Sequence, residues 1–101
     1  MNAVIDTPAS QLYSASNSLR PVNFYCTAPG AKSVGLAGDF NHWHPIPMRQ
    51  RVDGWWFIQV ELPRGHHQYH FLVDGQPTLD PLATGTARDD NNQPVSLLAV
   101  S

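Results

Sequence analysis

Polar and apolar residues alternate along most of the chain after Pro21, with the two-residue period that is typical of half-buried strands. Turn-forming Gly, Pro and Asp residues separate the alternating runs. The runs cover residues 22–26, 34–37, 55–62, 66–73 and 94–100. The pattern predicts an all-β fold, namely an antiparallel β-sandwich of about six to eight short strands.

The same alternation assigns side chains to the two faces of each expected strand. In residues 55–62, Trp56 and Ile58 lie on one face, and Trp55 and Phe57 lie on the other. We expect one face of every strand to build the core and the other to meet solvent or a ligand. The expected core contains Val22, Phe24, Cys26, Val34, Leu36, Trp56, Ile58, Val60, Tyr69, Phe71 and Val73.

The segments without alternation set the expected domain limits. Residues 1–20 hold four serines and no glycine, which favours a flexible tail before a domain of residues 21–101. Pro45 and Pro47 exclude a central strand in the irregular segment around them. Residues 76–94 show no clear period and are expected to be loop-like.

The charge content narrows the class of partner. Only 14% of the residues are charged, and the net charge is −2, so nothing indicates a binding surface for nucleic acid. No apolar run is long enough to span a membrane, and no basic residue precedes Arg20, so neither a membrane anchor nor a secretory signal is expected. The single cysteine, Cys26, suits a reducing cytoplasm.

Metal and cofactor sites are not expected. The histidines form two groups, His42 with His44, and His66 with His67 and His70. In a strand, His66 and His70 share a face while His67 points the other way, so these three do not converge on one ion.

The carboxylates do not suggest catalysis. Six of the seven aspartates lie in turns or loops, where they typically accept backbone N–H groups. No pair of carboxylates on rigid strands resembles the acid and base of a glycosidase. We therefore expect a chain that is not an enzyme.

Aromatic residues outside the expected core give the clearest functional indication. Trp43 lies in a proline-flanked loop, and Trp55 lies on the face opposite Trp56. A flat aromatic ring can stack on the C–H face of a pyranose, while amides, imidazoles and carboxylates bind its hydroxyls. A core or turn role for Trp43 is an open alternative. The polar candidates beside the rings are His70, Gln76, Asn91 and Asn92.

Several motifs in one order resemble the family 48 carbohydrate-binding modules. They are V-x-F-x-C-x-A-P-G-A at 22–31, V-G-L-A-G-D-F-N-H-W at 34–43, D-G-W-W at 53–56, L-P-R-G-H-H-Q-Y-H-F-L-V-D-G at 62–75 and D-P at 80–81. Within that family they are similar to the glycogen-binding domain of the AMP-activated protein kinase beta subunit. They also resemble the N-terminal early-set domains of isoamylases and branching enzymes.

The resemblance implies an immunoglobulin-like, early-set sandwich that binds α-1,4-glucans such as glycogen, starch or maltodextrins without catalysing a reaction. It assigns sugar stacking to Trp43 and places His70 where the family has a basic residue. The family's second stacking tryptophan corresponds to Pro77, which is a departure, and Trp55 is the only ring that we consider as a substitute. Asn91 or Asn92 would replace the family's C-terminal loop contacts.

An alternative interpretation follows from that departure. The chain would then be a structural early-set domain that docks on a glycoside hydrolase or kinase partner without strong sugar binding. Retention on glycogen would distinguish the two. The sequence does not indicate an oligomeric state.

Overall fold

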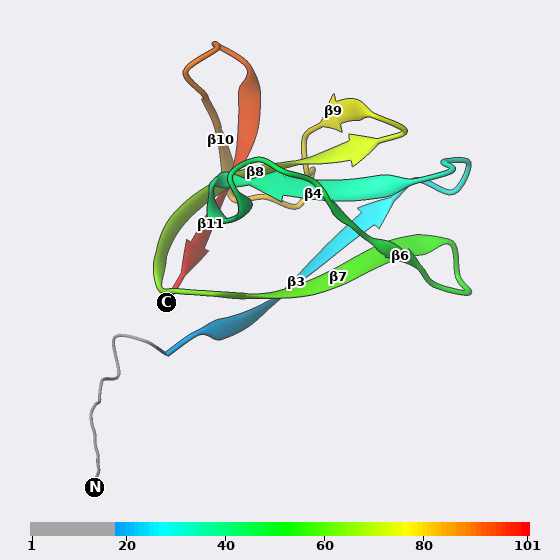
Figure 1. Ribbon diagram of the computed structural model, residues 1–101, viewed down its shortest axis with the longest axis horizontal. Helices are drawn as coiled ribbons and strands as arrows, with labels where there is room; N and C mark the ends of the chain where they lie inside the picture. Colours follow the sequence, from blue (N-terminus) through cyan, green and yellow to red (C-terminus); the bar gives the residue numbers. More distant parts are fainter. Residues whose placement is uncertain (1–17) are drawn as a thin grey trace, which may run out of the picture.

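The computed structural model describes residues 18–101 as a sandwich of two antiparallel sheets. Figure 1 shows the layer with β4 and β8 lying over the layer with β3 and β7. The strands are β3 (Arg20–Thr27), β4 (Val34–Gly38), β5 (Ile46–Pro47), β6 (Arg49–Gln50), β7 (Trp55–Leu62), β8 (Gly65–Val73), β9 (Gln76–Thr78), β10 (Gly85–Arg88) and β11 (Pro94–Val100), and a 3-10 helix, η2, covers Asp39–Asn41. The predicted all-β sandwich is confirmed.

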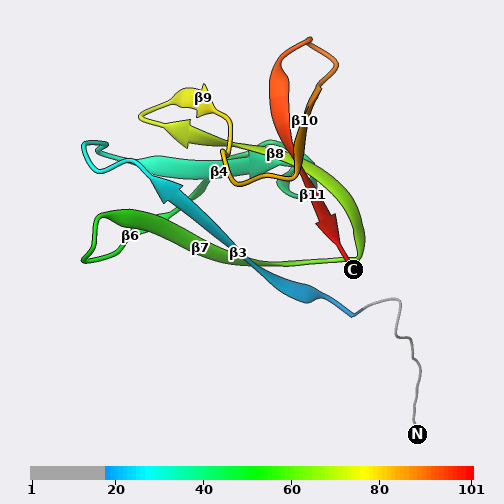
Figure 2. The ribbon, with the colours of Figure 1, turned by 180° about the vertical axis from the view of Figure 1, so that it is seen from behind.

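The larger sheet has the strand order β10-β11-β8-β4-β5, with β9 also pairing with β8. The smaller sheet has the order β3-β7-β6. The hairpin of β10 and β11 extends beyond the two layers in both views (Figures 1 and 2).

The core lies where the alternation predicted it. Phe24 and Cys26 of β3 pair in register with Ile58 and Trp56 of β7, and these side chains face the opposite sheet. From that sheet, Phe71 is almost completely buried beside them. Burying side chains of this size contributes about 2–3 kcal/mol each. The core cluster is Phe24, Cys26, Val34, Leu36, Met48, Trp56, Leu62, Tyr69 and Phe71.

A polar network fixes the loop after β9 to the core. The Tyr69 hydroxyl donates to Asp80 Oδ2 at 2.6 Å, and the Asp80 backbone N–H donates to Ser96 Oγ at 2.9 Å. Asp80 Oδ1 accepts from the Leu82 N–H at 2.9 Å. Burial and this carboxylate raise the pKa of Tyr69 well above its usual value, so the hydroxyl remains a donor. The expectation that Asp80 acts as a structural acceptor is confirmed.

The structure differs from the sequence prediction in the weakly periodic segments. Residues 76–94 were expected to be loop-like, but they contain β9 and β10, which pair with β8 and β11. β5 and β6 have only two residues each, and Pro47 is tolerated because β5 lies at a sheet edge. A short strand can pair through its backbone at a sheet edge without alternating apolar and polar side chains. The alternation therefore could not predict these strands.

The N-terminal tail expected over residues 1–20 lies mostly outside the described residues, and the first described strand, β3, begins at Arg20. Within residues 18–101, no helix has the length and apolar character needed to cross a membrane.

Candidate functional site

A hollow of about 470 Å³ lies on the outer face of the larger sheet. Three segments that are far apart in the sequence contribute to it, namely the turn after η2, the second half of β8 and the loop between β10 and β11. The lining residues are Trp43, His70, Leu72, Asp89, Asp90 and Asn91.

Trp43 reaches this face because the chain reverses directly after η2. His42 and Trp43 both adopt left-handed backbone conformations, with φ values of 56° and 59°. Such values are uncommon for residues other than Gly, Asn, Asp and His, so the surrounding contacts must hold the backbone of Trp43. The Trp43 N–H donates to the Gly38 carbonyl at 2.9 Å and closes the turn.

The side chain of Asn41 stabilises the same turn from inside. Its Oδ1 accepts from the Gly38 N–H at 2.9 Å, and its Nδ2 donates to the Leu36 carbonyl at 3.2 Å. Both contacts bond backbone groups of β4 at the point where that strand ends. The Asn of the G-D-F-N motif thus positions Trp43 and is not itself in the lining.

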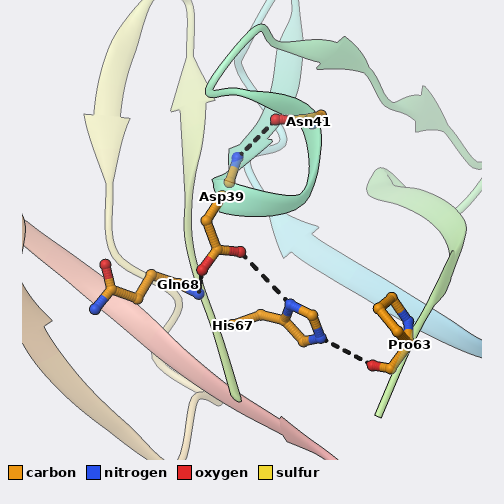
Figure 3. A network of polar contacts seen from close by, with 6 residues as sticks. Asp39, Asn41, Pro63, His67 and Gln68 are labelled. Atoms are coloured by element: carbon orange, nitrogen blue, oxygen red, sulfur yellow. Dashed lines mark hydrogen bonds and ion pairs between the residues drawn. The ribbon is translucent and has the colours of Figure 1, made fainter. Parts of the chain in front are cut away.

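Asp39 connects the turn to β8 (Figure 3). Its Oδ2 accepts from the Gln68 N–H at 3.0 Å, and its Oδ1 lies 3.5 Å from His67 Nδ1. The other ring nitrogen of His67, Nε2, donates to the Pro63 carbonyl at 2.9 Å. The last register pair between β4 and β8 is Gly38 with Tyr69. Asp39 therefore adds side-chain contacts between the two segments just beyond the end of that pairing.

Phe40 and Gly38 complete the base of the turn. The Phe40 ring stacks on Phe24 with centroids 6.0 Å apart, and its edge contact with His67 has the same centroid separation. A Cβ at Gly38 would lie 2.8 Å from the Gln68 carbonyl oxygen and would also overlap the Phe40 ring. Only glycine allows this close approach.

The loop between β10 and β11 is organised by Asp89. Its Oδ1 accepts from the N–H groups of Asn91 and Gln93, each at 2.9 Å. Asn92 adopts a positive φ of 62°, and its carbonyl accepts from Arg88 at 2.8 Å. The Asp89 carboxylate is thus occupied by the turn, while Asp90 and Asn91 keep exposed side chains at the hollow.

Trp43 and His70 form the centre of the hollow. Their ring centroids are 5.2 Å apart and their planes are tilted by 55°. Ala37, the register partner of His70, is only 1% exposed although it shares the outer face with His70. The outer face is therefore covered at this point, and Trp43 remains half-buried over it.

The environment of His70 favours its neutral form. Burial lowers the pKa of His70 below its usual value, and the nearby Asp89 charge opposes this only in part. Nδ1 is buried and has no hydrogen-bond partner among residues 18–101. Because a proton on Nδ1 would have no acceptor, the neutral tautomer with the proton on Nε2 is favoured. His70 then offers one N–H donor.

Three of the residues predicted from sequence meet in this hollow, namely Trp43, His70 and Asn91. Gln76 lies on the exposed edge strand β9 and Asn92 lies in the hairpin turn, and neither lines the hollow. Trp55 lies on β7 of the other sheet, where it contacts Tyr25.

Leu72, Asp89 and Asp90 line the hollow but were not predicted. Leu72 could have been found from the period alone, since it lies two residues after His70 and shares its face. Asp89 and Asp90 depend on how the hairpin tip folds back, for which the sequence carries no local signal.

Pro77, which stands where the family has a second tryptophan, is exposed on β9. It pairs in register with Leu72, so it lies next to the hollow without lining it. A ring at this position would be directed to the same face as Leu72.

No group of three or more His, Cys, Asp or Glu side chains that could hold a metal ion occurs in residues 18–101. The Cys26 thiol is buried, and burial followed by the Asp80 charge raises its pKa, so it remains protonated.

Comparison with known proteins agrees with this architecture. Subunit beta-1 of 5'-AMP-activated protein kinase from Sus scrofa is 46% identical over 67 residues, which are 66% of this chain and 53% of that protein. The Rattus norvegicus subunit beta-1 is 45% identical over 62 residues, covering 61% of this chain and 22% of that protein. The chain thus spans about half of the first relative and less of the second.

Two further similarities are to a branching enzyme and an amylase. The 1,4-alpha-glucan branching enzyme GlgB of Lactobacillus acidophilus is 42% identical over 66 residues, covering 59% of this chain and 10% of the enzyme. The structure of a maltogenic amylase from S. marinus matches with a TM-score of 0.67 at 20% identity, covering 80% of this chain and 13% of the amylase chain. The latter confirms the fold.

The family described as the glycogen recognition site of AMP-activated protein kinase matches residues 20–101. Since that match covers every strand that the structure describes, the resemblance to the family 48 carbohydrate-binding modules is confirmed, and the chain belongs to this family of glycogen recognition domains.

Proposed function

We propose that this chain binds α-1,4-glucans, such as glycogen, starch or maltodextrins, and catalyses no reaction itself. The observation that carries the proposal is the meeting of Trp43, His70 and Asn91 around one hollow of about 470 Å³. A hollow of this size lies within the usual range for small-ligand sites.

Each lining group has a role in this proposal. The indole of Trp43 stacks on the C–H face of one glucose unit, and Leu72 extends the apolar surface. The Nε2–H of His70 donates to a sugar oxygen, while the Asn91 amide and the Asp90 carboxylate bind hydroxyls at the rim. Because the sugar is neutral and His70 is neutral, binding should depend little on salt.

The relatives support the choice of ligand. The matching family is described by glycogen recognition, and the branching enzyme acts on 1,4-alpha-glucan. Both descriptions name polymers of glucose. An aromatic ring and uncharged hydrogen-bond donors are suited to binding this neutral sugar. We expect a cytoplasmic protein, since the buried Cys26 thiol has no disulfide partner among the described residues.

The proposal is tested by titrating maltoheptaose into the 15N-labelled protein and following amide shifts. We expect shifts around Trp43, His70 and Asn91, and a loss of about tenfold or more in affinity for Trp43→Ala. His70→Ala should also weaken binding, while His66→Ala, exposed on the same strand but outside the hollow, should not. No shifts at millimolar maltoheptaose, or unchanged affinity in Trp43→Ala, would overturn the assignment.

A second candidate function is docking onto a glucan-active enzyme or a kinase, with little sugar binding. The observation that favours it is Pro77, which leaves one ring at the hollow instead of two. The relatives also extend far beyond the matched segment, as the 22% and 10% coverage of two of them shows. Copurification with such a chain, together with no retention on a glycogen column, would select this function.

A further inference from the structure

The outer face of the smaller sheet carries an aromatic cluster that the site above does not use. Tyr25 of β3 pairs in register with Phe57 of β7, and their ring centroids are 5.2 Å apart. Trp55 lies two residues before Phe57 on the same face, and its ring meets Tyr25 edge to face, with centroids 6.4 Å apart and planes at 83°. Trp55 is 37% exposed, so part of the indole is open to a ligand.

A charged pair lies beside these rings in the turn between β6 and β7. Arg51 Nη2 is 3.0 Å from Asp53 Oδ2, and both side chains are about half exposed. Backbone bonds fix the turn, since the Arg51 N–H donates to the Trp55 carbonyl at 2.7 Å and Asp53 Oδ1 accepts from the Trp55 N–H at 3.0 Å. The pair is therefore held at a set position next to the indole.

Tyr25, Trp55 and the charged pair border one open hollow. It has a volume of about 260 Å³ and is lined by Tyr25, Arg51, Asp53, Trp55 and Leu82. A larger neighbouring hollow of about 570 Å³ shares Tyr25, Trp55 and Leu82 with it, so the two are adjacent along the same surface. Leu82, which is 71% exposed, contributes from the loop before β10.

The geometry points to a second glucan-binding subsite at Tyr25, Trp55, Arg51 and Asp53. A pyranose would stack on the open part of the Trp55 indole, against the edge of Tyr25. Its hydroxyls would meet guanidinium donors from Arg51 and carboxylate acceptors from Asp53. This inference rests on the proposed function, because it assigns the same class of ligand to a second surface.

The charge balance of the rim favours a neutral sugar over a charged ligand. Arg51 and Asp53 neutralise each other, so the rim offers both donors and acceptors without a net charge. A phosphorylated or acidic ligand would meet the repulsion of Asp53, and a basic one that of Arg51.

The two subsites lie on the outer faces of opposite sheets. His70 lies on β8 with Trp43 beside it, whereas Trp55 lies on β7. Figures 1 and 2 show that β8 and β7 belong to different layers. A branched polymer could engage both surfaces through different branches, which would raise its apparent affinity above that of a short oligosaccharide.

The test compares maltoheptaose with glycogen in the wild type, Trp43→Ala, Trp55→Ala and Arg51→Gln. The expected result is two sets of amide shifts with maltoheptaose, one around His70 and one around Tyr25 and the β6–β7 turn. Trp55→Ala should remove only the second set and weaken glycogen retention about tenfold. Arg51→Gln, at an exposed position where folding is not at risk, should lower the affinity reported by the second set of shifts several-fold.

Val52→Ala is the matched control. Val52 is fully exposed in the same turn and does not line the hollow, so both sets of shifts should remain. Shifts around His70 without any around Tyr25, unchanged by Trp55→Ala and Arg51→Gln, would overturn the second subsite and leave the proposed function intact. No shifts in either region would refute both, and shifts near Tyr25 caused only by a protein partner would overturn the assignment to sugar.

Discussion

Replacing Gly38 by alanine tests the packing that places Trp43. The backbone at Gly38 is extended, with φ −159° and ψ 177°, so alanine is compatible with the conformation. The strain must then come from the added methyl group. Its ideal position is 2.7 Å from Phe40 Cζ and 2.8 Å from the Gln68 carbonyl oxygen. The carbonyl belongs to the central strand β8, so it cannot move without disturbing the sheet.

The expected cost is the difference of two terms. Overpacking of this kind destabilises a protein by about 1–3 kcal/mol. Alanine also reduces the conformational entropy of the unfolded chain, which stabilises the folded state by about 0.4–1 kcal/mol. A net loss of about 1–2 kcal/mol is a large fraction of the roughly 5–10 kcal/mol that stabilises a domain of this size. It corresponds to a decrease in Tm of about 5–15 °C.

Thermal and urea unfolding, followed by tryptophan fluorescence, measure this change. Gly30→Ala is the control, because a Cβ at Gly30 meets nothing within 4 Å. Its Tm should remain at or slightly above that of the wild type. In Gly38→Ala, affinity for maltoheptaose should fall as well, since the Gly38 carbonyl accepts from the Trp43 N–H. A Tm within 2 °C, on the order of 0.3–0.5 kcal/mol, of that of Gly30→Ala would refute the reasoning.

Replacing Asp80 by alanine should lower the free energy of unfolding by about 1–3 kcal/mol in urea titrations, because the buried Tyr69 hydroxyl loses its acceptor; an unchanged midpoint would contradict this. Pro77→Trp should tighten maltoheptaose binding about tenfold in calorimetry, since residue 77 pairs with Leu72 beside the hollow. Acidification from about pH 7.5 to 5.5 should destabilise the wild type more than His70→Gln. The unfolded chain takes up a proton near the ordinary pKa of 6.5, whereas the folded His70 does so only at lower pH. Equal Tm slopes in both proteins would show that this ring does not contribute.

Strand alternation predicted the core well because each side chain in the long strands has one of two destinations. The even positions from Trp56 to Leu62 all contact or enter the core, as expected. Phe24 and Cys26 follow the same rule on β3. For these residues, the burial of apolar surface determines which face of the strand meets the core. The two-residue period of the local sequence shows which residues are buried.

The candidate site was only partly predictable, because its parts meet through tertiary contacts. Trp43 was found from its place outside any alternating run. The support from Asp39 and His67 depends on two strands that are distant in sequence but adjacent in space. Asn91 reaches the hollow, whereas its neighbour Asn92 is used by the turn. No sequence period distinguishes these two neighbours.

The three-segment origin of the hollow links recognition to folding. Trp43, His70 and Asn91 come from separate parts of the chain, so no single hairpin can form this proposed site alone. Partial unfolding that frees any one segment removes the whole site. If glucan binds there as proposed, it should stabilise the folded domain by RT ln(1 + [L]/Kd), about 2.7 kcal/mol when the sugar is present at about 100 times Kd. A shift in Tm with added sugar would thus report ligand binding and the assembly of all three segments on the larger sheet at once.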